Sequence, residues 1–363
     1  MLKSLDHHRL QPVTHSTNHV ARLPLIEFVP LMALLTAIDA LSIDTMLPAL
    51  PDIGRDFAVA AANDVQLVVS AMFRGMAVGG IGGPVSDSFG RRPAMFAGLS
   101  IYVVGTLAAI FATSFSALLA ARVLQGVGAA IPLVVMTALV RDLYEGAPMA
   151  SIMSFIGSVF ILVPVLAPLM GQAILLVAPW RAIFVMFLVL AIPCSVWFAL
   201  RQPETLPPER RIRFGFGRIA ATVVEVCASR VVIGYAVVEG LLFGAFLGYL
   251  SSAQQIFQDV YGLGTRFVLY FSCLSLAVGA ALFVNGTLVE RFGMQRMVTT
   301  GLAGLALMSA LFLPVVWSNA GAPPLWLFMA YMLAAFFAVG ILFGNLNALA
   351  MEPLGHIAGV GAA

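Results

Sequence analysis

The chain contains ten apolar runs, each long enough to cross a lipid bilayer as a helix. A segment inside hydrocarbon must satisfy its backbone hydrogen bonds internally, so each run predicts an α-helix. We therefore expect an all-α integral membrane protein. The runs are expected at roughly 25–48, 62–85, 94–112, 117–140, 150–178, 182–200, 231–252, 265–288, 297–317 and 324–348.

Composition supports the membrane class. Hydrophobic residues make up 61% of the 363 residues and charged residues 10%, whereas a soluble domain carries about 25% charged residues. The net charge is only +2, and no basic stretch is interleaved with aromatic residues, so we expect no nucleic-acid partner. Three scattered cysteines make neither a disulfide framework nor a metal site. The polar residues 1–22 do not resemble a cleavable signal peptide.

Basic residues are distributed unevenly between the connections. Fourteen of the nineteen Lys and Arg residues fall on the side of the N-terminus, and only Arg55, Arg181 and Arg266 fall in loops on the opposite side. Cytoplasmic loops of membrane proteins are enriched in Lys and Arg. The distribution therefore predicts a cytoplasmic N-terminus, with residues 1–24 as a cytoplasmic tail.

The longest connection, 201–230, divides the chain into two parts. Six runs precede it, within 25–200, and four follow it, within 231–363. It begins with a stretch rich in Pro and Arg and then turns amphipathic, which predicts a basic helix lying in the membrane surface. We expect a six-helix N-terminal bundle, a cytoplasmic linker and a C-terminal bundle.

A short charged segment joins the second and third runs. It reads Gly-Pro-Val-Ser-Asp-Ser-Phe-Gly-Arg-Arg and begins at Gly83. Asp87 is expected at the tip of this loop and Gly90 at its turn, while Arg91 and Arg92 mark the cytoplasmic side. The segment resembles the loop between helices 2 and 3 of the major facilitator superfamily, G-x-x-x-D-x-x-G-R-R/K.

Further motifs strengthen this resemblance. Arg122 and Gln125 stand in R-V-L-Q-G-V-G-A-A, which matches the helix-4 pattern of the superfamily. Asp44 stands in I-D-T-M-L-P, which resembles the bicyclomycin and chloramphenicol resistance branch of drug:proton antiporters. Glu290 and Gly293 weakly repeat the spacing of the 83–92 segment, as expected of two related halves.

The resemblance implies the major facilitator fold, with two pseudo-symmetric helical bundles and twelve helices in the full family. The C-terminal bundle is then expected to be incomplete, with four helices and, from residue 355, the start of a fifth. Helices 11 and 12 are expected to be missing from this chain.

Ionisable groups inside the bilayer are candidate functional residues. Asp44 is expected to bind a proton and exchange it for drug, the alternative being a hydrated acid at the outer interface. Asp39 points about 140° away on the same helix and is a second proton-site candidate nearer the bilayer centre.

Arg122 and Asp44 sit about 6–8 Å from the outer ends of their helices. Because helices 1 and 4 line the cavity in the family, these two residues are expected to face each other, with Gln125 nearby. The alternative is a purely structural ion pair.

Two further charges lie mid-span. Glu239 in the seventh run is expected to enter the cavity or to pair with Arg74 in the second, which must face protein or water. Glu27, at the start of the first run, is expected to be a solvated interfacial residue.

Two motifs concern conformational change. Ala167, Pro168 and Gly171 partly match the helix-5 antiporter motif G-x-x-x-G-P-x-x-G-G, which in the family marks exporters; the alternative is a generic proline kink. Asp142 ends the fourth run on the same side as Asp87 and Arg91. These three are expected to latch an inner gate in the outward-open state, the alternative being ordinary flanking charge. The gate also includes Gly83, Gly90 and Arg92.

The resemblance implies a bacterial inner-membrane exporter of small amphipathic drugs or antibiotics, driven by the proton gradient through alternating access. We expect a monomer in the lipid bilayer whose other partners are drug and protons. No glycine-lysine phosphate loop occurs, so neither ATP nor another cofactor is expected. No metal-ligand spacing, nucleophile elbow or catalytic histidine points to an enzyme. The alternatives are an inactive or partial transporter and a proton-linked metabolite importer or facilitator.

Overall fold

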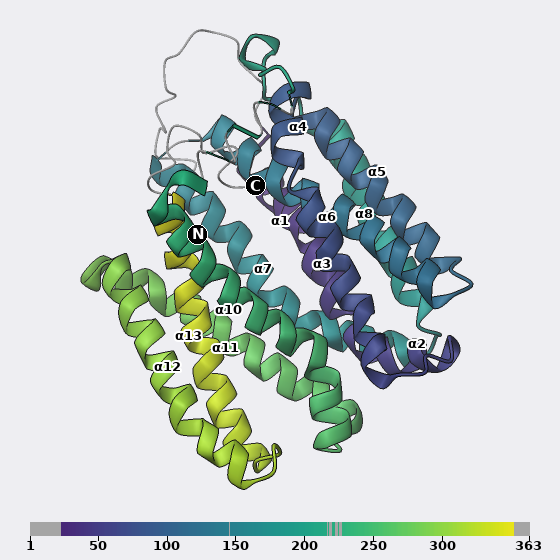
Figure 1. Ribbon diagram of the computed structural model, residues 1–363. Coiled ribbons are helices and arrows are strands. Elements are labelled where there is room, and N and C mark those ends of the chain that lie inside the picture. The colour runs from purple at the N-terminus through teal and green to yellow at the C-terminus, as the bar shows by residue number, and fades with distance from the viewer. Residues whose placement is uncertain are drawn as a thin grey trace.

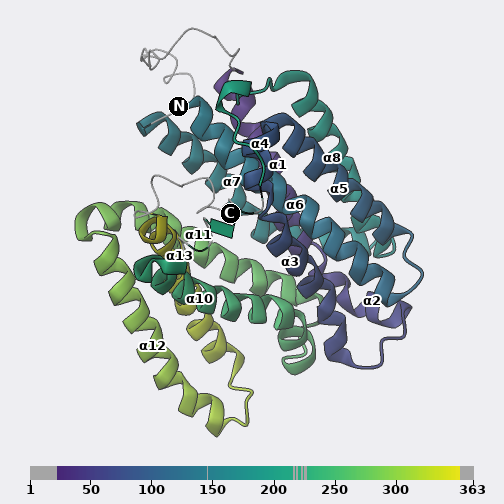
Figure 2. The same ribbon diagram turned by 45° about the horizontal axis from the view of Figure 1, so that its top comes forward.

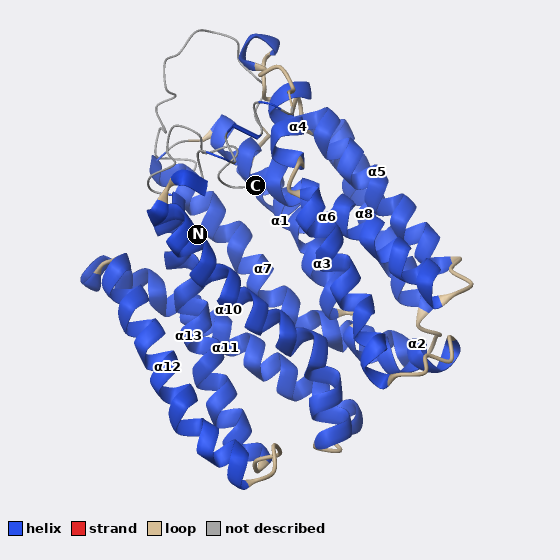
Figure 3. Ribbon diagram, in the orientation of Figure 1, coloured by secondary structure: helices blue, strands red, loops and turns tan. Residues whose placement is uncertain are grey.

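The computed structural model describes residues 23–351, apart from 145, 216, 218–219, 222–223 and 225–226. All regular structure in this part of the chain is helical (Figure 3), which confirms the all-α prediction. The predicted tail lies almost entirely outside the described residues, as does the segment from 355 onward. The predicted amphipathic helix of the linker is described only in part.

Every predicted run corresponds to a long helix. Within the described residues, nine helical stretches are long and apolar enough to cross a membrane, and α7 is a further helix of 30 residues. The long helices are α1 (Leu25–Asp44), α3 (Leu67–Gly79), α5 (Arg91–Ile110), α6 (Phe115–Leu143), α7 (Gly146–Leu175), α8 (Arg181–Arg201), α10 (Arg230–Gln255), α11 (Phe267–Phe292), α12 (Met294–Ser318) and α13 (Leu325–Met351).

The first two runs differ from their predicted extent. The first helix ends at Asp44, and a 3-10 turn (Leu47–Ala49) and the short α2 (Leu50–Asp56) follow it. Pro48 and Pro51 have no N–H and cannot continue the ladder of α1. The second run is interrupted after α3 and resumes as α4 (Gly82–Phe89).

The interruption of the second run changes the place of one motif residue. Asp87 lies inside α4 rather than at the tip of a loop. Only Gly90 separates α4 from α5, with φ at +106°, a conformation that glycine adopts readily. Gly293 makes the same break between α11 and α12 with φ at +77°. The two breaks agree with the predicted internal repeat.

The helices form two groups (Figures 1 and 2). The first group comprises α1–α8, coloured purple to teal, and the second comprises α10–α13, coloured green to yellow. The groups touch where α7 packs on α11 and α3 approaches α10. We call the end of the first group that carries Arg91, Arg92, Arg141 and Arg201 the basic end, and the opposite end, with loop 57–66, the far end.

Contacts between the groups lie from mid-helix toward the far end. Gln66, just before α3, donates from its side chain to Gln255 at the last residue of α10. The rings of Phe73 on α3 and Phe243 on α10 meet edge to face, with centroids 5.9 Å apart.

Helix α6 is the centre of the first group because glycines let its neighbours approach closely. A Cβ on Gly126 would lie 2.1 Å from the carbonyl oxygen of Met72 on α3, and one on Gly128 would lie 2.2 Å from the backbone nitrogen of Tyr102 on α5. Neither position has room for a side chain. This packing places Arg122 of α6 within reach of α1, α3 and α5.

Candidate functional site

Arg122 is fully buried and donates hydrogen bonds from all three side-chain nitrogens. Nε donates to the carbonyl oxygen of Val68 on α3 at 3.2 Å, and Nη2 donates to that of Ser42 on α1 at 3.0 Å. Nη1 donates to Gln125 Oε1 at 2.5 Å. A guanidinium bonded to three acceptors outside water holds α1, α3 and α6 in fixed positions.

The hydrogen-bond network continues to α5. Gln125 Nε2 donates to Thr106 Oγ1 at 2.9 Å, and the Tyr102 hydroxyl lies 2.6 Å from Ser42 Oγ. All these side chains are buried. Arg122 and Gln125 were predicted from the sequence as site residues, whereas Ser42, Tyr102 and Thr106 were not. Tyr102 and Thr106 stand four residues apart on a predicted span, a helical spacing that could have indicated them.

Asp39 and Asp44 are both buried on α1, with 4% and 5% of their surface exposed. Asp39 Oδ1 has no hydrogen-bond partner among the described residues. The predicted Arg122–Asp44 pair is not formed, because the guanidinium is occupied by Val68, Ser42 and Gln125. The charge of Arg122 acts on Asp39 instead.

The second group contributes a buried hydroxyl that the sequence analysis missed. Tyr249 OH on α10 has no hydrogen-bond partner in the described part of the chain, and the charge of Asp44 acts on it. The Tyr249 ring stacks on Phe271 of α11 with centroids 6.0 Å apart. It also meets Phe336 of α13 edge to face at 4.9 Å. An aromatic surface of the second group thus lies near Asp44 of α1.

The predicted alternative pairing of Glu239 with Arg74 is wrong. Glu239 is half-buried on α10 and lies within hydrogen-bonding reach of the Asn347 side chain on α13. Arg74 is exposed on α3. Glu239 is therefore associated with a neighbouring helix of its own group.

At the basic end, Arg91 joins two acids. Its Nη1 lies 2.5 Å from Asp87 Oδ1, and its Nε lies 2.8 Å from Asp142 Oδ2. The same Nη1 donates to Ser86 Oγ at 2.8 Å. Arg91 is 3% exposed, so these are ion pairs of a mostly desolvated guanidinium. The three predicted residues are therefore in contact, and their role as a latch stays a prediction.

The remaining residues of the predicted gate surround this cluster. Gly83 is buried and its carbonyl oxygen accepts from Ser86 Oγ at 2.9 Å. Arg92 Nη2 donates to the Ala199 carbonyl oxygen on α8 at 2.7 Å. The backbone nitrogens of Arg91 and Arg92 donate to the carboxylate of Glu204 in the linker. Glu204 was not among the predicted residues of the gate.

The helix-5 motif packs directly on α1. Ala167 is fully buried in a cluster with Ala37 and Ala40, and a Cβ on Gly171 would lie 2.1 Å from the Thr45 carbonyl oxygen. Small residues are therefore required at positions 167 and 171 of α7. The residues that they contact include Ala40 and Thr45, which follow Asp39 and Asp44 in the sequence.

The motif proline affects the opposite side of α7. Pro168 lacks the N–H that would bond to the Pro164 carbonyl four residues earlier. Ser275 of α11 donates to that free carbonyl at 3.5 Å, and Ser272 donates to the Val165 carbonyl at 2.8 Å. Helix α7 thus joins α1 to the second group.

Both ends of α8 carry the same arrangement of tryptophan, arginine and acid. At the far end, Arg181 Nη1 donates to Asp56 Oδ2 at 2.5 Å and Trp180 Nε1 donates to the same oxygen at 3.1 Å. At the basic end, Arg201 pairs with Glu27 at 2.6 Å and Trp197 Nε1 donates to it at 2.9 Å. The expectation that Glu27 is simply solvated is wrong.

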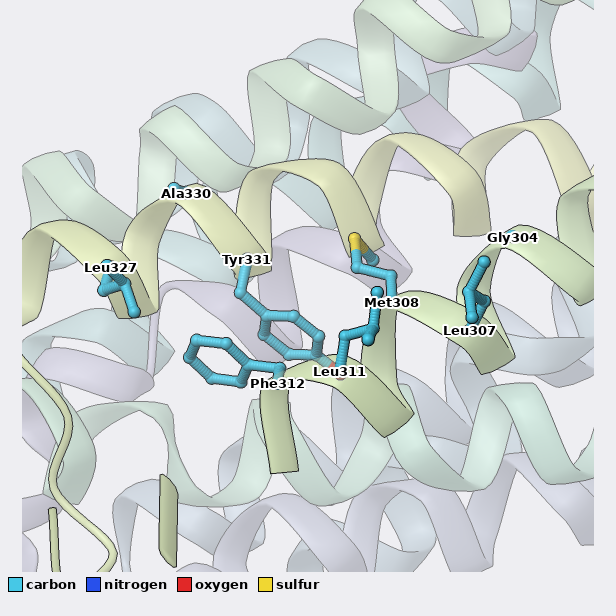
Figure 4. A pocket seen from close by; sticks show the side chains of 8 residues that line it. All are labelled: Gly304, Leu307, Met308, Leu311, Phe312, Leu327, Ala330 and Tyr331. Carbon is cyan, nitrogen blue, oxygen red and sulfur yellow. The ribbon is translucent and has the colours of Figure 1, made fainter. Parts of the chain in front are cut away.

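A separate open apolar groove of about 440 Å³ lies between α12 and α13 (Figure 4). Phe312 and Tyr331 line it and stack with centroids 4.3 Å apart. None of the residues that line it is charged. Its two helices belong to the second group, whereas Asp39 and Asp44 lie on α1 of the first group. In the described residues, no group of His, Cys, Asp and Glu could hold a metal ion.

Residues 32–363 match the family described as the Major Facilitator Superfamily. The chain belongs to this superfamily. It is therefore a multi-pass membrane transporter of small molecules and not an enzyme. In an all-helical chain with these motifs, the match confirms the predicted fold.

Three relatives show the position of the chain within the superfamily. An uncharacterized transporter, YdgK of Bacillus subtilis, is 30% identical over 336 residues, covering 91% of this chain and 82% of the relative. A bicyclomycin resistance protein homolog of Haemophilus influenzae is 28% identical, covering 76% and 70%. Multidrug resistance protein D of Escherichia coli is 29% identical, covering 93% and 84%. The predicted resemblance to drug:proton antiporters is thus supported.

A solved structure shares the fold. A D-xylose–proton symporter superposes with a TM-score of 0.67 at 15% identity, covering 93% of this chain and 87% of the symporter. At this identity the likeness concerns the arrangement of the helices alone.

Proposed function

We propose that this transporter exports small amphipathic drugs or antibiotics in exchange for protons. The observation that carries the proposal is the buried Asp39, whose Oδ1 has no hydrogen-bond partner among the described residues. Acids at membrane depth without a bonded cation are typical of proton relays. Asp44, buried five residues later, is the second proton carrier. The relatives named for bicyclomycin and multidrug resistance support drug as the exchanged substrate.

Transport would proceed by alternating access between the two groups. The contacts between the groups reach toward the far end. With a cytoplasmic N-terminus, this arrangement corresponds to an inward-facing state, in which drug and protons exchange at the basic end. The Asp87–Arg91–Asp142 cluster is already formed in this state and lies within the first group, so it would act as an inner gate only when the second group closes on it. Ala167, Pro168 and Gly171 would let α7 move between α1 and α11.

The remaining roles follow from position. Arg122 and Gln125 fix the helices around the acids, while Tyr249 and Glu239 contribute substrate contacts from the second group. The proton gradient supplies the energy, without ATP or another cofactor. We place the transporter in a bacterial inner membrane as a monomer with its N-terminus in the cytoplasm.

The test is efflux of a fluorescent lipophilic cation from cells expressing the chain, with and without a protonophore. We expect efflux that the protonophore abolishes and that Asp44→Asn also abolishes. Asp64→Asn is the matched control, because Asp64 is an exposed acid near the far end. Membrane expression of each variant is measured alongside.

Two outcomes would contradict the proposal. Efflux that survives the protonophore would indicate a facilitator rather than an antiporter. An absence of efflux with normal membrane expression would refute export of cationic drugs and favour a neutral substrate, an importer or an inactive chain.

A further inference from the structure

The first part of the linker packs on the first group of helices instead of leaving it. Gln202, Thr205 and Leu206 are buried, with 2%, 7% and 7% exposure. The backbone nitrogen of Ile212 donates to the Asp87 carbonyl oxygen at 3.0 Å. We call residues 202–212 the docked segment. It lies along α4, α5 and the end of α6.

Glu204 is the main attachment of the docked segment. Its Oε1 accepts from the backbone nitrogens of Arg91 at 2.9 Å, Thr205 at 3.0 Å and Leu206 at 3.0 Å, and its Oε2 accepts from that of Arg92 at 3.0 Å. The first N–H groups of a helix have no partner within it, and the helix dipole favours a negative charge there. Glu204 therefore caps α5 with a residue from a distant part of the sequence.

Gly90 allows the Glu204 carboxylate to approach. A Cβ at this position would lie 2.6 Å from Glu204 Oε2, closer than any real Cβ contact. Glycine is needed at position 90 for the positive φ and also for this approach. The contact between the 83–92 segment and the linker therefore depends on glycine at position 90.

The docked segment also contacts the Arg91–Asp142 ion pair. We call Asp87, Arg91 and Asp142 the inner cluster. Asp142 Oδ2 lies 2.8 Å from Arg91 Nε and accepts a hydrogen bond from Thr205 Oγ1 at 3.1 Å. Glu204 holds the backbone of Arg91, and its neighbour Thr205 holds the carboxylate of Asp142. Both members of the pair are thus positioned by adjacent residues of the linker.

We propose that Glu204 is a positioning residue of the inner cluster and that the docked segment moves with the first group as one body. The geometry of the Arg91–Asp142 pair depends on this attachment. The effect on transport rests on the proposed function, in which the cluster is a gate, whereas the attachment itself does not.

Limited trypsin digestion of the purified full chain tests the attachment. Arg210, Arg211 and Arg213 are exposed, but cleavage requires the surrounding backbone to detach. Glu204→Gln removes the charge and one acceptor oxygen, and we expect cleavage in the linker to become about tenfold faster. Glu209→Gln is the matched control, because Glu209 is an exposed acid of the same segment. Glu204→Asp should give an intermediate rate.

Transport kinetics test the positioning role. We expect Glu204→Gln to lower the maximal efflux rate while leaving KM unchanged, because the cluster affects conformational exchange and not substrate contact. Combining Glu204→Gln with Asp142→Asn should add little to either change alone, whereas Glu209→Gln with Asp142→Asn should be additive. If Glu204→Gln does not fold, Thr205→Val removes only the contact to Asp142.

The outcomes are distinguishable. Equal trypsin rates for Glu204→Gln and Glu209→Gln would overturn the attachment, whether or not the chain transports drug. Faster cleavage with an unchanged maximal efflux rate would overturn the positioning role. Faster cleavage in a chain whose wild type exports nothing would support the attachment and refute only the proposed function.

Discussion

Replacing Arg122 by lysine tests whether the buried guanidinium holds the first group together. Lysine keeps the charge but carries it on one nitrogen, whereas the three acceptors of Arg122 come from Val68, Ser42 and Gln125 on three helices. We expect two of these bonds to be lost. A hydrogen bond to a charged group contributes about 1.5–3 kcal/mol, so the loss of two in Arg122→Lys should lower the free energy of unfolding by about 3–6 kcal/mol.

The measurement is thermal unfolding of the purified protein in detergent. For a unit of roughly 150–250 residues, 1 kcal/mol changes Tm by about 2–4 °C, so a decrease of about 10 °C is expected. Arg74→Lys is the matched control, because Arg74 is exposed on the neighbouring helix α3. Its Tm should stay at the wild-type value.

Two results would refute this reasoning. If the Tm of Arg122→Lys lies within about 2 °C of that of Arg74→Lys, the three hydrogen bonds do not stabilise the fold. If Arg122→Lys is stable but no longer transports, the arginine acts in transport and not in packing.

The packing of α6 and its hydrogen bonds give two further predictions. Gly126→Ala should lower the free energy of unfolding by about 1–3 kcal/mol, because its Cβ would lie 2.1 Å from the Met72 carbonyl oxygen. Gly248→Ala on α10, with open space around its Cβ, should raise it by about 0.5–1 kcal/mol, and thermal unfolding showing both changes with one sign would contradict the close approach. Tyr102→Phe removes the 2.6 Å bond to Ser42 and should cost about 1 kcal/mol in the same assay while efflux persists. Loss of efflux at normal stability would instead indicate that the Tyr102 hydroxyl acts in transport.

The helices could be predicted from the sequence because apolar length is a local property. The Asp87–Arg91–Asp142 cluster could also be predicted, since its members flank the ends of neighbouring helices on one side. Whether Arg122 and Asp44 form a pair could not be predicted in the same way. Rise per residue gives the depth of each side chain but not its direction around the helix in the packed structure.

Other contacts leave little trace in the sequence. Two acceptors of Arg122 are backbone carbonyls, of Ser42 and Val68, which every residue possesses. Glu204 is 113 residues from Arg91 and bonds to its backbone nitrogen, so no side-chain pattern reports the contact. The Tyr249 hydroxyl comes near Asp44 only through the arrangement of the two groups.

The two ends of α8 have a consequence for the transporter in its membrane. A helix of 21 residues is about 30 Å long, close to the thickness of the hydrocarbon core. Tryptophan and paired charges at both ends favour the two water interfaces. The apolar length of α8 between its two charged ends therefore matches one bilayer thickness. A thicker bilayer would have to thin locally or bury one of the charged ends, so lipid chain length should set the tilt at which the first group sits.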